Sequence, residues 1–152
     1  MSAAFADVGA PPAQEDWRGA LVLARDAHGR ALMQLRDDFP GVAGPGMWSL
    51  FGGGVEAGES LLEAALREFA EETGIALAPG DLSPLARTRA SARPAGALYV
   101  YDVSRSVEPA AIRLGEGAGF GFLTGAQIDA WPVLPQIREV LHFARRKREA
   151  AA

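Results

Sequence analysis

The sequence predicts an α/β domain in which helices pack on a mixed β-sheet. Short apolar segments of strand-like composition lie on both sides of one strongly amphipathic helix, and a second amphipathic helix follows near the C-terminus. Strands and helices that follow one another in this way are typical of layered α/β domains. The chain has 152 residues, which is enough for one domain with a buried core.

The N-terminal segment differs in composition from the rest of the chain. Residues 1–16 are rich in Ala, Gly and Pro, so we expect a flexible leader there. These residues lack the basic start and the apolar stretch of a secretory signal, and we expect no such signal. We place the domain at residues 17–148 and a short C-terminal tail at residues 149–152.

The first half of the domain is predicted to consist of strands joined by turns. Two apolar runs separated by turn residues predict a pair of strands, and a segment dense in Pro and Gly then predicts a loop. A short strand after this loop runs into a glycine turn. In order, these segments are the strand 20–25, the turn 26–30, the strand 31–36, the loop 39–46, the strand 47–51 and the glycines 52–54.

The helix predicted at residues 60–73 has clear start and stop signals. Ser60 is followed three residues later by Glu63, which is the spacing of a capping box. Gly74 comes directly after Thr73, at the position where a left-handed residue ends many helices. We therefore assign Gly74 a structural role at the end of this helix.

The second half of the chain is predicted to add strands and to close with helices. Apolar residues spaced i, i+3, i+4 and i+7 predict an amphipathic helix that begins near Pro135. The basic run 145–148 suits the end of that helix, where cations complement the helix dipole, and we interpret it as a solvated helix end. The other segments are the strands 85–90, 97–103 and 120–123 and a short helix at 124–130.

The composition excludes several classes of partner. The net charge is −4 and the pI about 5.2, whereas binding to a nucleic-acid polymer relies on basic patches. No apolar run approaches the roughly 18–20 residues that span a bilayer. The chain has no cysteine, which excludes disulfides and is compatible with a reducing cytoplasm. We expect a cytoplasmic monomer or homodimer that takes a small ligand, with neither a membrane nor a nucleic-acid polymer as partner.

Three glutamates on the predicted helix carry the strongest functional signal. Glu68, Glu71 and Glu72, at i, i+3 and i+4, occupy a helix face that adjoins the apolar face at Glu72. Like charges at these spacings cost roughly 0.2–0.5 kcal/mol per pair on an exposed helix, and anions in the last turn also oppose the helix dipole. A bound cation removes these penalties. Hard oxygen ligands on one face suit Mg²⁺ or Mn²⁺.

The glycines before this helix are consistent with a ligand site beside the acids. Gly52, Gly53 and Gly54 let the backbone run close to a ligand and present bare carbonyls and amides to it. We expect Gly53 and Gly54 to approach the substrate. Glycines in a strand-to-helix turn are also common for geometric reasons alone, so this signal gains its meaning from the glutamates.

These residues match the signature motif of the Nudix hydrolase family. The motif is Gly, five residues, Glu, seven residues, Arg-Glu, a hydrophobic residue, any residue, Glu-Glu, any residue, Gly and a hydrophobic residue. The chain resembles the family at every fixed position of the motif, and in the order of its predicted elements over about residues 17–148. The matching residues are Gly53, Glu59, Arg67-Glu68, Phe69, Glu71-Glu72, Gly74 and Ile75.

The resemblance implies a Nudix-type α/β/α sandwich with a mixed β-sheet. It implies a hydrolase that cleaves the diphosphate linkage of a nucleoside diphosphate derivative, with Mg²⁺ or Mn²⁺ as cofactor. By this resemblance the three helix glutamates and the carbonyl of Gly52 hold the metal ions, Arg67 orients the carboxylates, and Glu59 braces the loop.

Residues outside the motif supply further candidates. Arg36 resembles the phosphate-contacting arginine of the mutator-protein branch of the family, and Glu116 resembles the distal glutamate of that branch, a metal ligand or a base. The alternatives are a surface strand residue for Arg36 and an ordinary loop acid for Glu116. Trp48 and Phe120 are candidates for stacking on a nucleobase, although aromatic residues more often pack in cores.

The resemblance is closest to the branch that hydrolyses nucleoside triphosphates to monophosphate and pyrophosphate. The markers of the dinucleotide branches are missing from this sequence. We expect Glu68 to act as the general base, with Glu116 as the alternative. An ADP-ribose or nucleotide-sugar pyrophosphatase remains an alternative function. A nucleotide-binding regulatory module without catalysis is another, although the intact set of glutamates argues against it.

Overall fold

An eight-stranded mixed sheet forms the middle layer of the protein in its computed structural model, which describes residues 4–152. The strands are β1 (Ala6–Asp7), β2 (Trp17–Arg25), β3 (Ala31–Leu35), β4 (Trp48–Ser49), β5 (Phe51–Gly54), β6 (Leu82–Arg89), β7 (Gly96–Ser106) and β8 (Gly119–Leu123). The order in the sheet is β1-β6-β7-β2-β3-β4, with β5 paired to β2 and β8 paired to β3. The pairs β1–β6 and β2–β7 are parallel, and the others are antiparallel.

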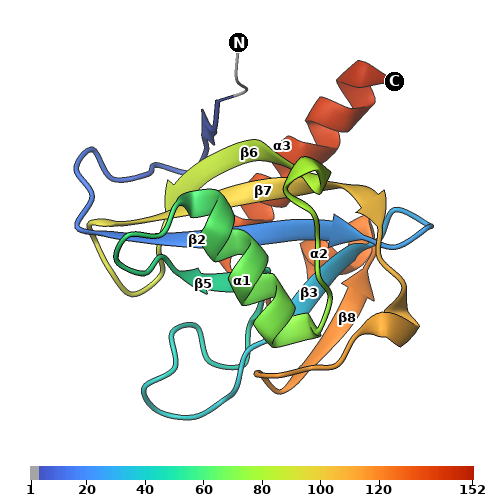
Figure 1. Ribbon diagram of the computed structural model, residues 1–152, viewed down its shortest axis with the longest axis horizontal. Helices are drawn as coiled ribbons and strands as arrows, with labels where there is room; N and C mark the ends of the chain where they lie inside the picture. The colour runs from blue at the N-terminus through green and yellow to red at the C-terminus, as the bar shows by residue number, and fades with distance from the viewer. Residues whose placement is uncertain (1–3) are drawn as a thin grey trace.

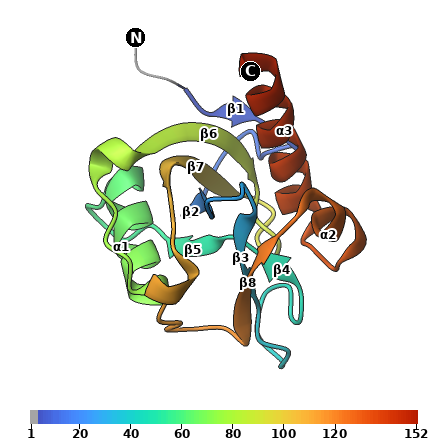
Figure 2. The ribbon, with the colours of Figure 1, turned by 90° about the vertical axis from the view of Figure 1, so that its right-hand side faces the viewer.

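Helices cover both faces of this sheet. Figure 1 shows α1 (Leu61–Thr73) lying across β2 and β5. In Figure 2, α2 (Gly125–Ala130) and α3 (Pro135–Ala151) lie on the opposite side of the sheet from α1. The two remaining elements are the short 3₁₀ helices η1 (Pro79–Asp81) and η2 (Pro109–Ala111). The structure therefore confirms the predicted α/β/α sandwich. Over residues 4–152, no helix has both the length and the apolar character that a bilayer span requires.

Strand β2 shows why the sheet needs cover on both faces. Residues 19–24 form an uninterrupted buried run. Leu21 and Leu23 belong to the core cluster that includes α3, whereas Ala20 and Val22 belong to the cluster that includes α1. Successive side chains of a strand point to opposite faces, so a continuous apolar run requires a helix on each side.

Helix α1 has the predicted caps and the predicted buried face. The Ser60 hydroxyl accepts from the Glu63 amide at 3.0 Å, and the Glu63 carboxylate accepts from the Ser60 amide at 2.8 Å. Gly74 ends the helix with a left-handed φ of 74°. On the buried face, the Phe69 ring meets the Phe51 ring edge to face at a centroid distance of 6.3 Å. These contacts fix α1 against β5.

The two ends of the described chain contain regular secondary structure. Most of the predicted flexible leader is bound along the sheet, because β1 pairs with the otherwise open edge of β6. Further along, the Glu15 carboxylate accepts from Tyr99 at 2.6 Å and pairs with Arg87 at 2.9 Å. Residues 1–3 of the predicted leader lie outside the described residues. Residues 149–151 of the predicted tail continue α3, which ends at Ala151.

The glycines predicted as a turn are part of the sheet. Gly52, Gly53 and Gly54 lie opposite Leu21, Ala20 and Gly19 on β2, so the backbone stays extended to the end of β5. The turn comes only afterwards, at residues 55–60. This pairing places the glycine backbone directly beside α1.

Candidate active site

The acidic face of α1 lies against the glycines of β5. Glu72 is only 4% exposed. One of its carboxylate oxygens accepts from the Gly52 amide at 3.0 Å, and the other accepts from the Gln34 side chain at 3.1 Å. Outward from Glu72, the Glu68 side chain is 19% exposed and the Glu71 side chain 58%. The three acids thus lead from the core to the solvent, as expected where an acidic face adjoins an apolar face.

The surroundings of Glu72 oppose its ionisation. Burial raises the pKa of Glu72 to about 7, and the negative charge of Glu68 and that of Glu116 raise it as well. The hydrogen bonds from Gly52 and Gln34 act in the opposite direction. A carboxylate held beside two other carboxylates in the protein interior is costly without a cation, because burial disfavours charge and like charges repel.

Arg67 organises the outer acids. Its Nε and Nη2 atoms bind the two carboxylate oxygens of Glu59 at 2.7 and 2.9 Å. This paired hydrogen bond holds the pKa of Glu59 at about 2. The remaining nitrogen, Nη1, binds Glu68 at 2.9 Å and lies 3.3 Å from Glu71. Glu59 therefore anchors Arg67, and Arg67 sets the positions of the Glu68 and Glu71 carboxylates.

Two of the glycines are required by close approach. Gly52 has a φ of 147°, and a Cβ atom there would lie 2.1 Å from the carbonyl oxygen of Ala20. A Cβ atom on Gly53 would lie 2.6 Å from the carboxyl carbon of Glu68. A side chain at Gly53 would push that carboxylate away, so the bare backbone of β5 lets Glu68 and Glu72 reach the same strand.

A cleft of about 640 Å³ opens beside Glu72. The structure brings four predicted site residues together in its wall: Arg36, Gly52, Glu72 and Glu116. Gln34 joins them, and its side-chain amide donates both to Glu72 and, at 3.1 Å, to the carbonyl of Glu116. The Arg36 side chain donates to the carbonyl of Ala43 in the neighbouring loop.

The carboxylates do not yet converge on one point. Among residues 4–152, no three acidic or histidine side chains form a group arranged to hold a metal ion. Their hydrogen bonds give the reason, because Arg67 draws Glu68 and Glu71 outward while Gly52 and Gln34 hold Glu72 inward. The donor chemistry nevertheless fits a hard divalent cation, since the oxygens are carboxylates and a cation would offset the burial of Glu72 among like charges.

The two aromatic candidates have different positions. Trp48 packs against Trp131 at a centroid distance of 5.7 Å and against the core cluster that includes α3. Trp48 does not line the cleft, because it pairs with Leu35, one position out of phase with Gln34, and points to the other face. Phe120 lies directly opposite Gln34 on β8 and is 37% exposed.

Residues that the sequence did not single out complete the site. Gln34 is 6% exposed and lies in an otherwise apolar strand. A polar residue inside an apolar run was the sequence signal that could have identified Gln34 as a site residue. A second hollow of about 280 Å³ shares Arg36, Ala43 and Gly52 with the cleft. Trp17 and Arg93 line this hollow, and the Arg93 guanidinium lies 4.9 Å from the centroid of the Trp17 ring. Trp17 and Arg93 are far apart in the sequence, so this contact could not be predicted from it.

The fold and the intact motif together define a protein of the Nudix class. The NUDIX domain family model matches residues 16–142, so the chain belongs to the NUDIX family. Over 40 residues it is 52% identical to the nucleoside triphosphatase NudI of Salmonella arizonae. That match spans 26% of this chain and 28% of NudI.

Solved structures of the family share the whole fold. The chain is similar to the MutT protein from Methanosarcina mazei Go1, with 25% identity and a TM-score of 0.72 over 92% of this chain and 99% of that one. It is also similar to the MutT NUDIX hydrolase from Burkholderia pseudomallei, with 26% identity and a TM-score of 0.65 over 83% and 95% of the two chains. The protein therefore has the fold of the MutT/Nudix hydrolases.

Replacing Glu72 by Gln is expected to remove a pH dependence of stability. The pKa of Glu72 is raised to about 7 in the folded protein from 4.5, so the folded state holds the proton between these values and stability falls as the pH rises through them. At pH 8 without divalent ions, Glu72→Gln should be more stable than the unmodified protein by about 3 kcal/mol. The difference should disappear below about pH 4.5.

Urea denaturation in the presence of EDTA measures this difference across the pH range. Glu108→Gln, which removes the same charge at an exposed position outside the motif, is the matched control and should follow the unmodified protein. A stability difference for Glu72→Gln that stays constant from pH 4.5 to 8 would contradict the assignment of the raised pKa.

Proposed function

We propose that the protein is a divalent-metal-dependent hydrolase that converts a nucleoside triphosphate to the monophosphate and pyrophosphate. The observation that best supports this proposal is the buried carboxylate of Glu72 at the wall of the cleft. Gly52 and Gln34 hold this carboxylate in place by hydrogen bonds. The negative charges of Glu68 and Glu116 lie close to it. This arrangement is unfavourable on its own but suits a protein that binds a hard cation together with phosphates.

The proposed metal ligands are the three glutamates of α1. Glu68, Glu71 and Glu72 supply carboxylate oxygens, and the Gly52 carbonyl and Glu116 are further oxygen donors near them. The cation is Mg²⁺ or Mn²⁺, which prefer such ligands. When bound, the ion neutralises the charge that the phosphates bring into the cleft. Arg67, anchored on Glu59, keeps the outer carboxylates in reach of the site.

The proposed reaction is a hydrolysis at the linkage between the α- and β-phosphates. The oxygen of a water molecule forms a bond to one phosphorus, and the bridging oxygen leaves with the other phosphoryl group. The proton of the water passes to a carboxylate, a role that we assign to Glu68, with Glu116 as the alternative. Positioning and charge neutralisation supply most of the rate enhancement in chemistry of this type.

The two connected cavities suggest how the substrate is divided. We place the phosphates in the cleft, with Arg36 as a cationic contact, and the nucleoside in the second hollow. Trp17, together with the Arg93 guanidinium that lies over its ring, offers a flat wall to a base there, and Gly53 and Gly54 also line that hollow. Phe120 borders Gln34 and is a further candidate for contact with the substrate.

A substrate panel tests the proposed reaction. The protein with Mg²⁺ or Mn²⁺ is incubated with nucleoside triphosphates, ADP-ribose and nucleotide sugars, and the products are identified by chromatography. Monophosphate and pyrophosphate in equal amounts from triphosphates are expected. Preferential cleavage of ADP-ribose would favour the pyrophosphatase alternative; the NUDIX domain of Shewanella oneidensis NrtR, which has this fold, was solved with ADP-ribose. Binding without turnover of any compound would favour a regulatory module.

Replacing the metal-binding carboxylates should abolish turnover without unfolding the protein. Glu68→Gln and Glu72→Gln are each expected to lower kcat by at least about 100-fold, because charge neutralisation and proton transfer each contribute on that scale. The thermal midpoint should stay level or rise, because the repulsion between the acids decreases. Glu108→Gln is the control, and near-normal turnover in both variants would refute the metal assignment.

Gln34→Met is expected to weaken the site without removing a metal ligand. The variant leaves Glu72 with the Gly52 amide alone, and loss of a group that orients a ligand typically costs about 10–100-fold in metal affinity or activity. The Mg²⁺ concentration at half-maximal rate measures this effect, and added Mg²⁺ should restore part of the rate. Unchanged metal dependence with normal turnover would show that Gln34 has only a packing role.

A further inference from the structure

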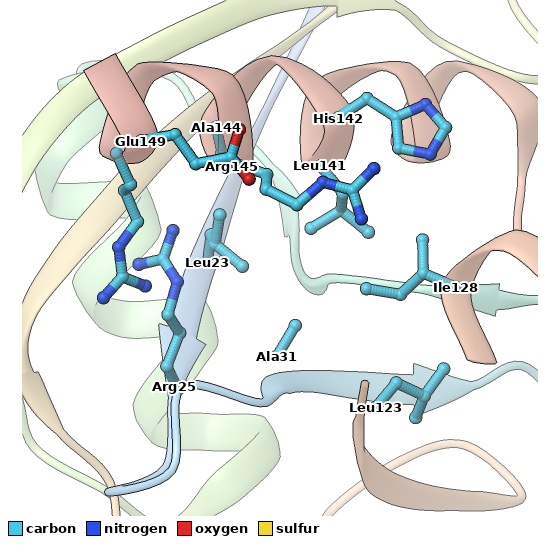
Figure 3. Close-up of a pocket in the computed structure, with 12 residues that line it drawn as sticks. Leu23, Arg25, Ala31, Leu123, Ile128, Leu141, His142, Ala144, Arg145 and Glu149 are labelled. Carbon is cyan, nitrogen blue, oxygen red and sulfur yellow. The ribbon is translucent and has the colours of Figure 1, made fainter. Parts of the chain in front are cut away.

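A third cavity, the α3 pocket, lies on the opposite face of the sheet from α1. It has a volume of about 280 Å³ and lies between the sheet and α3 (Figure 3). Its floor is apolar, with Leu23, Leu123, Ile128 and Leu141 each at most 8% exposed. None of its lining residues lines the cleft or the second hollow, so the pocket is separate from the proposed hydrolase site.

Three arginines from two elements surround this apolar floor. Arg25 comes from the end of β2, and Arg145 and Arg148 come from α3. Figure 3 shows Arg25 pointing from its strand toward α3 and Arg145 extending over the pocket. Arg25 pairs with Asp102 at 2.5 Å. Arg145 and Arg148, in contrast, form no ion pair with any acid of residues 4–152.

A solvated helix end explains only part of this arrangement. Cations in the last turn of a helix complement the helix dipole, which accounts for Arg148. The dipole does not account for Arg25, which comes from the sheet, nor for an apolar pocket beneath three guanidinium groups. Like charges three residues apart on a helix also repel, and Glu149, four residues after Arg145, offsets this repulsion between Arg145 and Arg148 only in part because it is a single acid beside two cations.

We propose that this pocket binds a small amphipathic organic anion. The apolar body of the ligand lies on the floor, and its carboxylate or phosphate monoester group meets the guanidinium groups of Arg145, Arg148 and Arg25. Arginine suits both head groups, because its planar fork can donate two parallel hydrogen bonds. The pocket volume is at the lower end of the range for small-molecule sites, so the ligand is smaller than a nucleoside triphosphate.

Glu149 adds a negative charge to a pocket whose other charged lining residues are arginines. It also lines the pocket, and Figure 3 shows its carboxylate turned toward the same space as Arg145. The lining therefore carries three arginines, of which Arg25 is paired with Asp102, one acid, and His142, whose ring lies 2.6 Å from Asp129. A bound anion is attracted by the arginines and repelled by the acid, so removal of the Glu149 charge should strengthen binding.

Calorimetric titration with octanoate and with phenyl phosphate tests the proposal on the unmodified protein. Saturable binding of at least one, with a dissociation constant below about 1 mM, is expected, and 1-octanol should bind at least about tenfold more weakly. The comparison of the two anions shows whether the pocket prefers a carboxylate or a phosphate monoester. No saturable binding of either anion would overturn the proposal.

Methyl-labelled isoleucine locates the bound probe. The chain has four isoleucines, of which Ile128 lines the pocket and Ile75 belongs to the core cluster that includes α1. In NMR spectra the probe should shift the Ile128 signal and leave the Ile75 signal in place. Shifts confined to Ile75 would place the ligand at another site and refute the proposal.

Neighbouring arginines on α3 provide matched variants. Arg145→Gln and Arg148→Gln should each weaken binding by about tenfold, the effect of losing one charge-assisted contact. Arg146→Gln removes the same charge from a residue that does not line the pocket, and it should leave affinity unchanged. Glu149→Gln should tighten binding. Equal weakening by Arg145→Gln and Arg146→Gln would indicate attraction to overall charge and overturn the proposed site.

Glu72→Gln separates this proposal from the hydrolase proposal. That variant changes the cleft on the other face, so it should bind the probe with unchanged affinity. Probe binding in a protein that hydrolyses none of the panel substrates would support the pocket while counting against the proposed reaction. Hydrolysis of a panel substrate without probe binding would support the proposed reaction and overturn the proposed pocket.

Discussion

The buried carboxylate of Glu72 is the contact on which the site depends. It joins α1 to β5 through the Gly52 amide and to β3 through Gln34, and Gln34 in turn holds the carbonyl of Glu116. Three segments distant in sequence therefore meet at one acid. Because that acid is buried next to other negative charges, its position is costly in the absence of a cation. The same cost makes this point of the fold suited to binding one.

The charged residues around Glu72 form a chain of contacts, in which each side chain holds the next one in place. Glu59 anchors Arg67, Arg67 holds Glu68, and Glu68 lies against Gly53. The guanidinium group of Arg67 offsets part of the negative charge of Glu68 and Glu71. On the other face of the sheet the charges are reversed, and arginines surround an apolar pocket. The sheet thus separates an acidic site under α1 from a basic one under α3.

Much of the fold and part of the site could be predicted, because they depend on local patterns. The capping box of Ser60, the stop at Gly74 and the faces of α1 depend on residues close in sequence, so the helix and the position of Glu72 beside its apolar face followed from spacing. The face of the sheet to which Trp48 points could not be predicted, because it depends on the pairing with Leu35. The pairing of the leader with the open edge of β6 could not be predicted, because that edge lies about eighty residues away in the sequence.

The sequence by itself determined the layered fold, the family and the acidic face of α1. Each depends on residue types at fixed short spacings, where helix and strand geometry leave little freedom. Only the tertiary structure decided that Gln34 supports Glu72, that Trp17 meets Arg93, and that Arg25 joins two arginines of α3 around a pocket. Those contacts arise from strand register and from the packing of helices on opposite faces, which couple residues far apart along the chain.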